Sequence, residues 1–354
     1  MKLEVVRAQN LNPKPQDESK LGFGNIFTDY MLTIPYTAGK GWHDAQIRPF
    51  ENFSLSPACM VLHYSQTIFE GLKAYRGTTG INLFRPWDNF ARLNASARRM
   101  CIPEINEGFA LEAMCELIRI EQDWVPRSEG TSLYIRPAII STDPFLGVRA
   151  GETYLFFIIL SPVGAYYSSG LKPVDIYVED EYVRAVVGGT GAVKTGGNYA
   201  ASLVAGQIAH SKGFSQVLWL DGKEKKYVEE VGSMNIFFKI RGELYTAALT
   251  GSVLPGITRD SVIRLAREMF DINVREERIS IADIFAENAS GGLEEVFGTG
   301  TAAVVSPVGG MEWEGKRITV GDGKMGMLTA QLYEKLTGIQ YGREEDPFGW
   351  IKTL

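Results

Sequence analysis

Histidine and cysteine are scarce in this chain of 354 residues, which contains three of each. No two histidines stand four residues apart and no cysteine pair has the C-x-x-C spacing, so we expect no metal site. Three scattered cysteines also argue against a disulfide framework and favour a reducing compartment. The first 20 residues are polar and of mixed charge, unlike a secretory or transit peptide. We therefore predict a cytoplasmic protein.

Long apolar runs and basic clusters are also missing. The longest apolar run, Tyr154–Leu160, has seven residues, whereas a membrane-spanning helix needs about 20. The net charge is −6, and the basic stretch Lys223–Lys226 is interrupted by Glu224. We therefore expect neither nucleic acid nor a membrane as a partner. No G-x-S-x-G motif offers the nucleophile of a hydrolase triad.

The residue pattern that is present predicts a mixture of helices and strands. Gly213 and Gly338 are expected to close two of the helices, and Arg241-Gly242 to form a hairpin turn. The predicted helices are Trp87–Met100, Phe109–Trp124, Tyr199–Ser211, Arg259–Phe270 and Met325–Leu336. The predicted strands are Ser132–Ile140, Tyr154–Leu160, Asp175–Val178, Val217–Leu220, Asn235–Ile240 and Glu243–Thr246.

These elements favour an α+β fold of two domains, a prior that the chain length supports. We predict a smaller α/β domain at residues 1–165 and an interdomain loop at 166–174, where glycine and serine gather. A larger domain follows at 175–354. Ligands often bind at such a seam.

The most unusual segment is GGTGAVKTGGNY, residues 188–199. It is neither a P-loop nor a G-x-G-x-x-G motif, because Val193 precedes the lysine and Lys194 takes the third glycine position. A lysine among small residues can be partly desolvated, which lowers the pKa of its amine and makes it a nucleophile for a carbonyl. A surface lysine in a flexible loop would give the same letters, and for this segment alone that reading is the commoner one.

Other candidate residues are ordinary singly and informative together. Tyr199 is a phenol at a helix start, and Glu230 a carboxylate near a strand. Gly256, Ile257 and Thr258 precede a helix whose free N–H groups favour an anion. The turn at residues 298–302 and Arg92 could add N–H groups and a positive charge. A nucleophilic amine, a phenol, an acid and phosphate-binding turns are what pyridoxal 5′-phosphate requires.

Ten motifs, in order from about residue 21 to the end, resemble the branched-chain amino acid aminotransferases of the fold-type IV pyridoxal-phosphate enzymes. They are FGNIFTDYM (23–31), LHYSQTIFEGLKAYRG (62–77), LFRPWDNFARL (83–93), TSLYIRP (131–137), SPVGAYY (161–167), VKTGGNY (193–199), QVLWLDG (216–222), EEVGSMNIFF (229–238), LPGITR (254–259) and EVFGTGTAAVVSPV (295–308). The resemblance implies the two-domain architecture of D-amino acid aminotransferase-like enzymes and a homodimer.

The resemblance also implies a role for each matching residue. Lys194 would form a Schiff base with the cofactor, Tyr199 would bond its phenolic oxygen, and Glu230 would pair with its ring nitrogen. The other cofactor contacts would be Arg92, Ser233, Leu254, Gly256, Ile257, Thr258 and Thr301. The substrate would meet Phe23, Tyr64, Phe69, Tyr134, Tyr166, Ala302 and Ala303, with Arg136 supporting this wall. The implied reaction transfers an amino group from leucine, isoleucine or valine to 2-oxoglutarate by ping-pong kinetics.

The sequence is also compatible with other functions. Another transaminase of the same fold could act on D-amino acids or amines, and an aminodeoxychorismate-type lyase would eliminate rather than transfer. A non-catalytic relative would be expected to lose Lys194 or Glu230, and both are present. Ala303 and Ser306 stand where animal members carry a CxxC pair, so redox control through that pair does not carry over. Cys101 and Cys115 fall in or beside apolar helix faces, where we expect burial to make them inert.

Overall fold

The computed structural model describes residues 1–164 and 171–354, which form two compact units. Unit 1 comprises Met1–Ser168, Val193–Gly196 and Gly338–Leu354, and unit 2 comprises Ser169–Ala192 and Gly197–Thr337. Most of the predicted loop at 166–174 lies outside the described residues, so the predicted domain boundaries stay a prediction. Among the described helices, none combines the length and the apolar character that crossing a bilayer requires.

Unit 1 is built on a sheet whose strands run in the order β1-β4-β2-β9-β8-β6-β7-β19, with β3 beside β2 and β5 beside β8. The pairings are antiparallel except that of β1 with β4. The strands are β1 (Leu3–Val5), β2 (Tyr30–Thr37), β3 (Gly41–Trp42), β4 (Ala45–Pro49), β5 (Thr67–Phe69), β6 (Leu72–Arg76), β7 (Ile81–Phe84), β8 (Ser132–Ser141), β9 (Thr153–Val163) and β19 (Ile351–Thr353).

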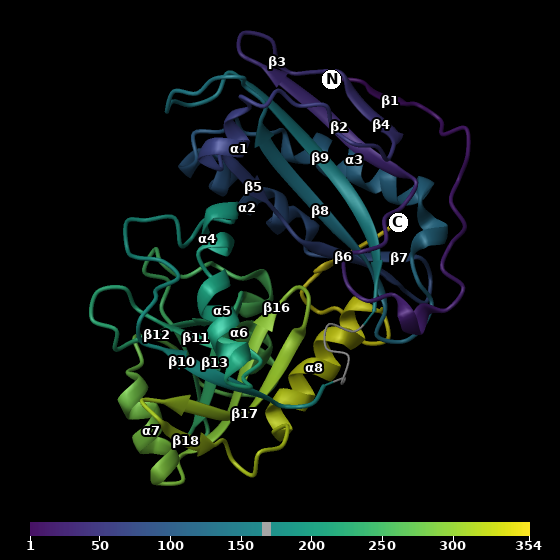
Figure 1. Ribbon diagram of the computed structural model, residues 1–354. Coiled ribbons are helices and arrows are strands. Elements are labelled where there is room, and N and C mark those ends of the chain that lie inside the picture. Colours follow the sequence, from purple (N-terminus) through teal and green to yellow (C-terminus); the bar gives the residue numbers. More distant parts are fainter. Residues whose placement is uncertain (165–170) are drawn as a thin grey trace. The chain divides into compact units, whose positions relative to one another are not determined.

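The helices of unit 1 pack against this sheet (Figure 1). They are α1 (Met60–Tyr64), α2 (Pro86–Arg99) and α3 (Glu107–Ile120), with short 3₁₀ turns at Glu18–Lys20 and Gln122–Trp124. Helix α2 begins with Pro86, whose fixed φ suits the first turn, and Asn106 caps α3 by accepting a bond from Phe109 N–H. Phe90 and Leu93 of α2 are buried in the same hydrophobic core as Ile135 and Phe156 of the sheet. This buried apolar face fixes the side of α2 that carries site residues.

Unit 2 contains a closed barrel. The strand order is β12-β11-β10-β17-β16-β13, and the additional pairing of β12 with β13 closes the ring; β14, β15 and β18 extend the sheet. Phe237 and Phe297 stack inside unit 2 with ring centroids 5.3 Å apart. The strands are β10 (Val174–Glu179), β11 (Gln216–Leu220), β12 (Val228–Val231), β13 (Met234–Ile240), β14 (Glu243–Thr246), β15 (Val274–Glu276), β16 (Leu293–Gly300), β17 (Val304–Trp313) and β18 (Lys316–Thr319).

Three helices of unit 2, α5, α6 and α7, lie beside this sheet (Figure 1). Helix α5 packs on β10 and β11, and α6 packs on β15 and β16. The bounds are α4 (Gly196–Ala200), α5 (Leu203–Ser211), α6 (Ile257–Glu268), α7 (Ile281–Ala289) and α8 (Met327–Gln340). The order of helices and strands and the mixed pairing confirm the predicted α+β class.

The structure corrects two helix predictions. The single helix predicted at Tyr199–Ser211 is wrong, because it is divided into α4 and α5. The Ser202 hydroxyl donates to the Tyr199 carbonyl over 2.7 Å at that break, competing with the helical bond. Helix α8 does not close at Gly338 but runs to Gln340. Gly338 is a glycine for another reason, since a Cβ there would collide with the Glu344 side chain.

The hairpin prediction at Arg241-Gly242 is confirmed: both residues have positive φ, 50° and 81°, between β13 and β14. Two positive φ values in a two-residue loop match the twist of the flanking strands. The prediction for Cys115 is also confirmed, whereas Cys101 is exposed rather than buried. Cys101 lies just beyond the end of α2 with a φ of 53°, so the helix face does not cover it.

Candidate active site

The backbone around Lys194 belongs to unit 1 although its flanking residues belong to unit 2. The Lys194 carbonyl accepts a bond from Phe69 N–H at 3.0 Å, and its own N–H donates to Ser96 Oγ at 3.2 Å. The Thr195 hydroxyl donates to the Thr67 carbonyl at 2.7 Å. These bonds attach the lysine segment to β5 and α2, so Lys194 does not lie in a loose surface loop.

The Lys194 side chain is surrounded by aromatic and charged groups. Its Nζ lies 4.8 Å from the centroid of the Phe69 ring. Burial, together with the nearby Arg92 charge, lowers the pKa of the Lys194 amine to about 8, and the Glu70 charge opposes this shift. At pH 7 a larger fraction of this amine is therefore unprotonated than in an ordinary lysine. This is the chemical condition that a nucleophilic amine requires.

Arg92, which the sequence offers as a phosphate ligand, lies on α2 and forms a two-pronged ion pair with Glu70. Its Nε and Nη2 lie 2.7 and 2.8 Å from the two carboxylate oxygens. The carboxylate is 1% exposed and the Arg92 side chain 10% exposed. The pair therefore fixes a cation in the same unit as Lys194.

The predicted substrate wall is partly assembled within unit 1. The rings of Phe23 and Tyr134 lie 5.0 Å apart, and the Arg136 guanidinium lies 4.7 Å from the Phe69 ring. Arg136 donates to the Tyr134 hydroxyl at 2.8 Å, because residues two apart on β8 share a face. Tyr64 donates its hydroxyl to the Leu146 carbonyl instead. Tyr166 lies outside the described residues.

Gly71 is a glycine for a steric reason. It follows Glu70, and a Cβ at this position would collide with the Tyr134 hydroxyl. The glycine therefore lets Tyr134 approach the backbone closely, beside the segment that carries Glu70.

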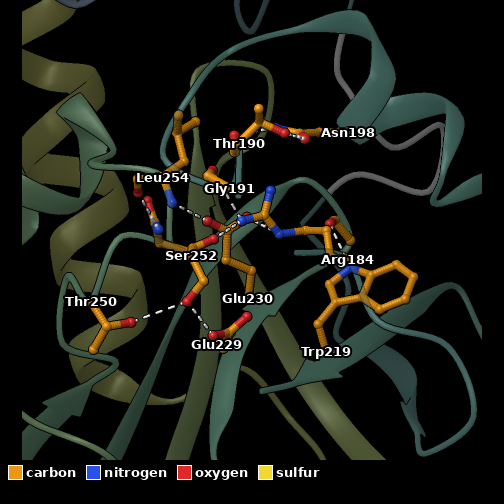
Figure 2. A network of polar contacts seen from close by, with 12 residues as sticks. Arg184, Thr190, Gly191, Asn198, Trp219, Glu229, Glu230, Thr250, Ser252 and Leu254 are labelled. Carbon is orange, nitrogen blue, oxygen red and sulfur yellow. Dashed lines mark hydrogen bonds and ion pairs between the residues drawn. The ribbon is translucent and has the colours of Figure 1, made fainter. Parts of the chain in front are cut away.

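Glu230 lies on β12 in unit 2, at the seam that closes the barrel, and its side chain is 3% exposed. It is therefore a buried carboxylate. One oxygen accepts a bond from Leu254 N–H at 2.6 Å, and the other lies 3.3 Å from Arg184 Nε (Figure 2). Asn235, directly across the strand pair from Glu230, donates to the Leu254 carbonyl at 2.9 Å. The two side chains thus bind both backbone polar groups of Leu254, its N–H and its carbonyl.

Arg184 connects three segments of unit 2, as Figure 2 shows. Besides the Glu230 carboxylate, its guanidinium donates to the carbonyls of Gly191 and Ser252, the first at 3.2 Å. Gly191 must be a glycine here, because a Cβ would collide with the Ser252 backbone. The glycine-rich segment before Lys194 is thereby joined to the loop that leads into α6.

Helix α6 begins directly after this loop. Gly256 is its N-cap residue, and within the described residues no side chain caps the helix start. Ile257 and Thr258 form its first turn, whose N–H groups face along the helix axis. A Cβ on Gly256 would collide with the Asn235 side chain, so the same asparagine that holds Leu254 also requires this glycine. The helix start has the donors and the dipole direction that suit an anion.

The remaining predicted residues of unit 2 lie on turns and on α4. Ser233 follows Gly232 in the two-residue turn between β12 and β13. Thr301, Ala302 and Ala303 form the turn between β16 and β17, which Val304 closes with a φ of 62°. A left-handed conformation is uncommon for a β-branched residue. Tyr199 lies on α4 and is half-buried.

The sequence reasoning missed Glu70, Ser96 and Arg184. Glu70 had a signal, because it is a single charge within the apolar run from Ile68 to Leu72. Arg184 had none, since it follows the acidic residues of EDEY as an ordinary surface arginine would. In the part of the chain that the structure describes, no three His, Cys, Asp or Glu side chains are grouped closely enough to hold a metal.

The sequence and structure are similar to a well-defined set of proteins. The family described as Amino-transferase class IV matches residues 67–310. Branched-chain-amino-acid aminotransferase 2 of Bacillus subtilis is 56% identical over 98% of this chain and 96% of its own length. Branched-chain-amino-acid transaminase 1 of the same organism is 57% identical over 94% of each chain.

Two solved structures extend the comparison. The branched-chain amino acid aminotransferase of Escherichia coli is 30% identical with a TM-score of 0.77, over 92% of this chain and 99% of its own. The T.th. branched-chain amino acid aminotransferase complexed with N-(5′-phosphopyridoxyl)-L-glutamate is 28% identical with a TM-score of 0.73, over 91% and 98%. This chain therefore belongs to the class IV aminotransferases and, within them, to the branched-chain-amino-acid aminotransferases.

Proposed function

We propose that this chain catalyses the reversible transfer of an amino group between L-leucine, L-isoleucine or L-valine and 2-oxoglutarate, with pyridoxal 5′-phosphate as cofactor. The observation that carries the proposal is the setting of Lys194. Its amine lies against Phe69 and has a pKa lowered to about 8 by burial and by Arg92. An aldehyde cofactor requires such an amine, and the chain's family membership supplies the reaction type.

The residues present fit the cofactor in their chemistry. Lys194 offers the amine for the aldehyde, and Arg92 a fixed positive charge for the phosphate. In unit 2, the start of α6 offers N–H groups at Ile257 and Thr258. Glu230 offers a buried carboxylate for the ring nitrogen. We assign further contacts to the other predicted cofactor residues, Tyr199, Ser233, Leu254, Gly256 and Thr301.

Each residue has a defined task in the reaction. Pyridoxal phosphate, when bound, supplies a conjugated ring that takes up the electron pair left on the substrate α-carbon. Lys194 removes the α-proton as a general base and returns a proton as a general acid. Glu230 offers its carboxylate to the ring nitrogen and stabilises a positive charge there. Lys194 serves both half-reactions, so one substrate must leave before the other enters, which gives ping-pong kinetics.

The substrate side chain is assigned to an aromatic wall. Phe23, Phe69 and Tyr134 supply apolar surface for branched side chains, and Tyr64 and Tyr166 complete the set that we propose. Arg136 holds the Tyr134 hydroxyl and can attract the distal carboxylate of glutamate. Ala302 and Ala303 are assigned to the substrate carboxylate through their backbone, in the turn that Val304 closes with its unusual φ. Unusual backbone conformations of this kind gather at functional sites.

We further propose a homodimer that works in the cytoplasm. The dimer follows from the resemblance to the family. The cytoplasmic location is supported by three cysteines that are free thiols.

Product analysis tests the proposed function. The purified protein is incubated with isoleucine, 2-oxoglutarate and pyridoxal phosphate, and the products are identified by mass spectrometry. We expect glutamate and the branched 2-oxo acid in equal amounts. Elimination products without glutamate would indicate a lyase. A reaction with D-alanine or with a simple amine, in place of isoleucine, would indicate another transaminase of this fold.

A further inference from the structure

Glu70 lies between β5 and β6 and is the buried carboxylate of unit 1 that faces Arg92. Its backbone N–H donates to the Pro137 carbonyl at 2.8 Å, which attaches this residue to β8. The residue is 1% exposed. A carboxylate so deeply buried is costly unless it is fully paired. The groups that pair with Glu70 therefore explain why a carboxylate can be buried at this position.

Four donors meet this carboxylate. Arg92 binds both oxygens through Nε and Nη2, at 2.7 and 2.8 Å. Asn89, one helical turn earlier on α2, donates to Oε2 at 2.8 Å, and Gly71 N–H donates at 3.2 Å. A two-pronged pair fixes the plane of a guanidinium as well as its position. Glu70 thus determines the orientation of the Arg92 side chain.

The same carboxylate acts on Lys194. Burial would raise the pKa of Glu70, but Arg92, Lys194 and Asn89 together hold it below its usual value, so the group is ionised at neutral pH. Four groups of unit 1 act on the Lys194 amine, namely Arg92 from α2, Glu70, and Tyr134 and Arg136 from β8. The two arginines lower the pKa of the amine, and Glu70 and Tyr134 raise it.

We propose that Glu70 is a positioning residue that orients Arg92 for the cofactor phosphate and balances its charge beside Lys194. The proposal deepens the proposed function and rests on it for the identity of the phosphate. A merely structural Glu70 would tie the β5–β6 turn to α2, and its charge would not matter to Lys194. The two roles differ in the titration of the lysine, which a structural role leaves unchanged.

The test measures Lys194 directly in the full chain. Cofactor is removed, the protein is labelled with acetic anhydride over a range of pH, and the modified Lys194 peptide is quantified by mass spectrometry. In Glu70→Gln, which keeps the shape but loses the charge, we expect the apparent pKa of Lys194 to fall by about one unit. The dissociation constant for pyridoxal phosphate, measured by absorbance, should rise about tenfold, because Arg92 is no longer fixed.

Two further variants separate the effect of the Glu70 charge from the effect of its side-chain length. Glu70→Asp keeps the charge on a shorter side chain. The pKa of Lys194 should therefore stay near its value in the unsubstituted protein, whereas cofactor binding should weaken because the shorter side chain no longer holds Arg92 in place. Glu70→Gln with Arg92→Gln removes both charges of the pair. In that double variant the pKa of Lys194 should return toward its value in the unsubstituted protein. The double variant leaves no unpaired charge buried, so it can still be measured if Glu70→Gln alone fails to fold.

Glu121→Gln is the control, because Glu121 is another buried acid of unit 1, 3% exposed, and accepts a bond from Tyr30 N–H instead. Burial raises the pKa of Glu121 to about 7, so near pH 8, where Lys194 titrates, Glu121 is mostly ionised. We expect it to leave the titration of Lys194 unchanged. The proposal is overturned if Glu70→Gln folds normally and Lys194 titrates as before, or if Glu121→Gln causes the same shift. Labelling requires no turnover, so a failure of the proposed function would appear in the product analysis and not here.

Discussion

Each unit of this aminotransferase contains a buried arginine–glutamate pair, and the two pairs exchange roles. In unit 1, Arg92 is the proposed cofactor ligand, and Glu70 grips it with both oxygens. In unit 2, Glu230 is the proposed ligand, and Arg184 approaches it with Nε at 3.3 Å. The Arg184 guanidinium also donates to the carbonyls of Gly191 and Ser252 (Figure 2).

The difference shows that a buried arginine–glutamate pair can offer either the arginine or the glutamate to a ligand. A two-pronged grip orients the arginine, which can still use the rest of its fork of donors. A glutamate that must hold a ring nitrogen needs its negative charge, and a full grip by arginine would neutralise it. In unit 2 the Glu230 carboxylate is therefore held by the backbone N–H of Leu254 and by a contact with Arg184 that is longer than those between Arg92 and Glu70.

The largest effect is expected at Lys194, whose amine both proton transfers require. Lys194→Ala should lower turnover by about 10⁴, since a positioned general base typically contributes up to that factor. Steady-state rates with isoleucine and 2-oxoglutarate measure the loss. In the normal protein, borohydride reduction with cofactor followed by peptide mapping should find the adduct on Lys194, and an adduct on another lysine would contradict the assignment.

Glu230→Gln should come next, because a neutral amide cannot hold the positive charge on the cofactor ring. We expect turnover to fall about 10²–10³-fold while the cofactor stays bound. Absorbance of the dialysed protein measures retention, and single-turnover rates measure the loss. Glu229→Gln is the matched control, because that neighbouring carboxylate bonds Ser252 and not Leu254. Turnover close to normal in Glu230→Gln would falsify the role.

Arg184→Gln should have a smaller effect than Glu230→Gln, about tenfold on turnover, because Glu230 keeps its bond from Leu254 N–H. The control is Arg278→Gln, an arginine of unit 2 whose side chain is 48% exposed and pairs with Glu224. If Arg184→Gln cost as much as Glu230→Gln, the arginine would be a principal participant and the exchange of roles would be refuted.

Arg136→Met sharpens the comparison on the substrate side, where an arginine supports a phenol instead of a carboxylate. Losing the 2.8 Å bond to Tyr134 should slow the glutamate half-reaction about fivefold more than the isoleucine half-reaction. Only glutamate brings a second carboxylate to the aromatic wall, and aspartate, one methylene shorter, should react poorly. Single-turnover rates decide it, and equal losses in both halves would leave Arg136 a structural role only.

The smallest effect is expected from thiol oxidation, and it also distinguishes the units, because Cys59, Cys101 and Cys115 all precede residue 168. Burial raises the pKa of the Cys115 thiol to about 11, so it is unreactive. Peroxide should modify the exposed Cys101 and change activity less than twofold. Loss of activity that a thiol reductant restores would contradict this prediction; Cys101→Ser identifies the thiol concerned.

The sequence predicted helices and strands better than it predicted the tertiary contacts between them. Strand and helix periods located α2, α6 and the hairpin of β13 and β14, because those signals are local. The exposed Cys101 and the continuation of α8 through Gly338 depend on tertiary packing, which no local pattern carries. The glycine-rich segment singled out Lys194, and the family motifs gave Lys194 and Glu230 their roles. The pairing of Glu70 with Arg92 and of Arg184 with Glu230 became visible only in the fold, because these residues are far apart in the sequence.

Lys194 is encoded in the second half of the chain, yet its stretch 193–196 is grouped with the first. A fragment ending at Ser168 would contain Ser96 and Glu70 without the lysine, and the complementary fragment would contain the lysine without the groups that dock it. A single crossover between residues 168 and 193 would produce a hybrid gene. Its protein would combine the lysine segment of one parent with residues 67, 69 and 96, which bind that segment, of the other parent. Functional recombinants of such enzymes should therefore inherit residues 193–196 together with residues 1–168 from one parent.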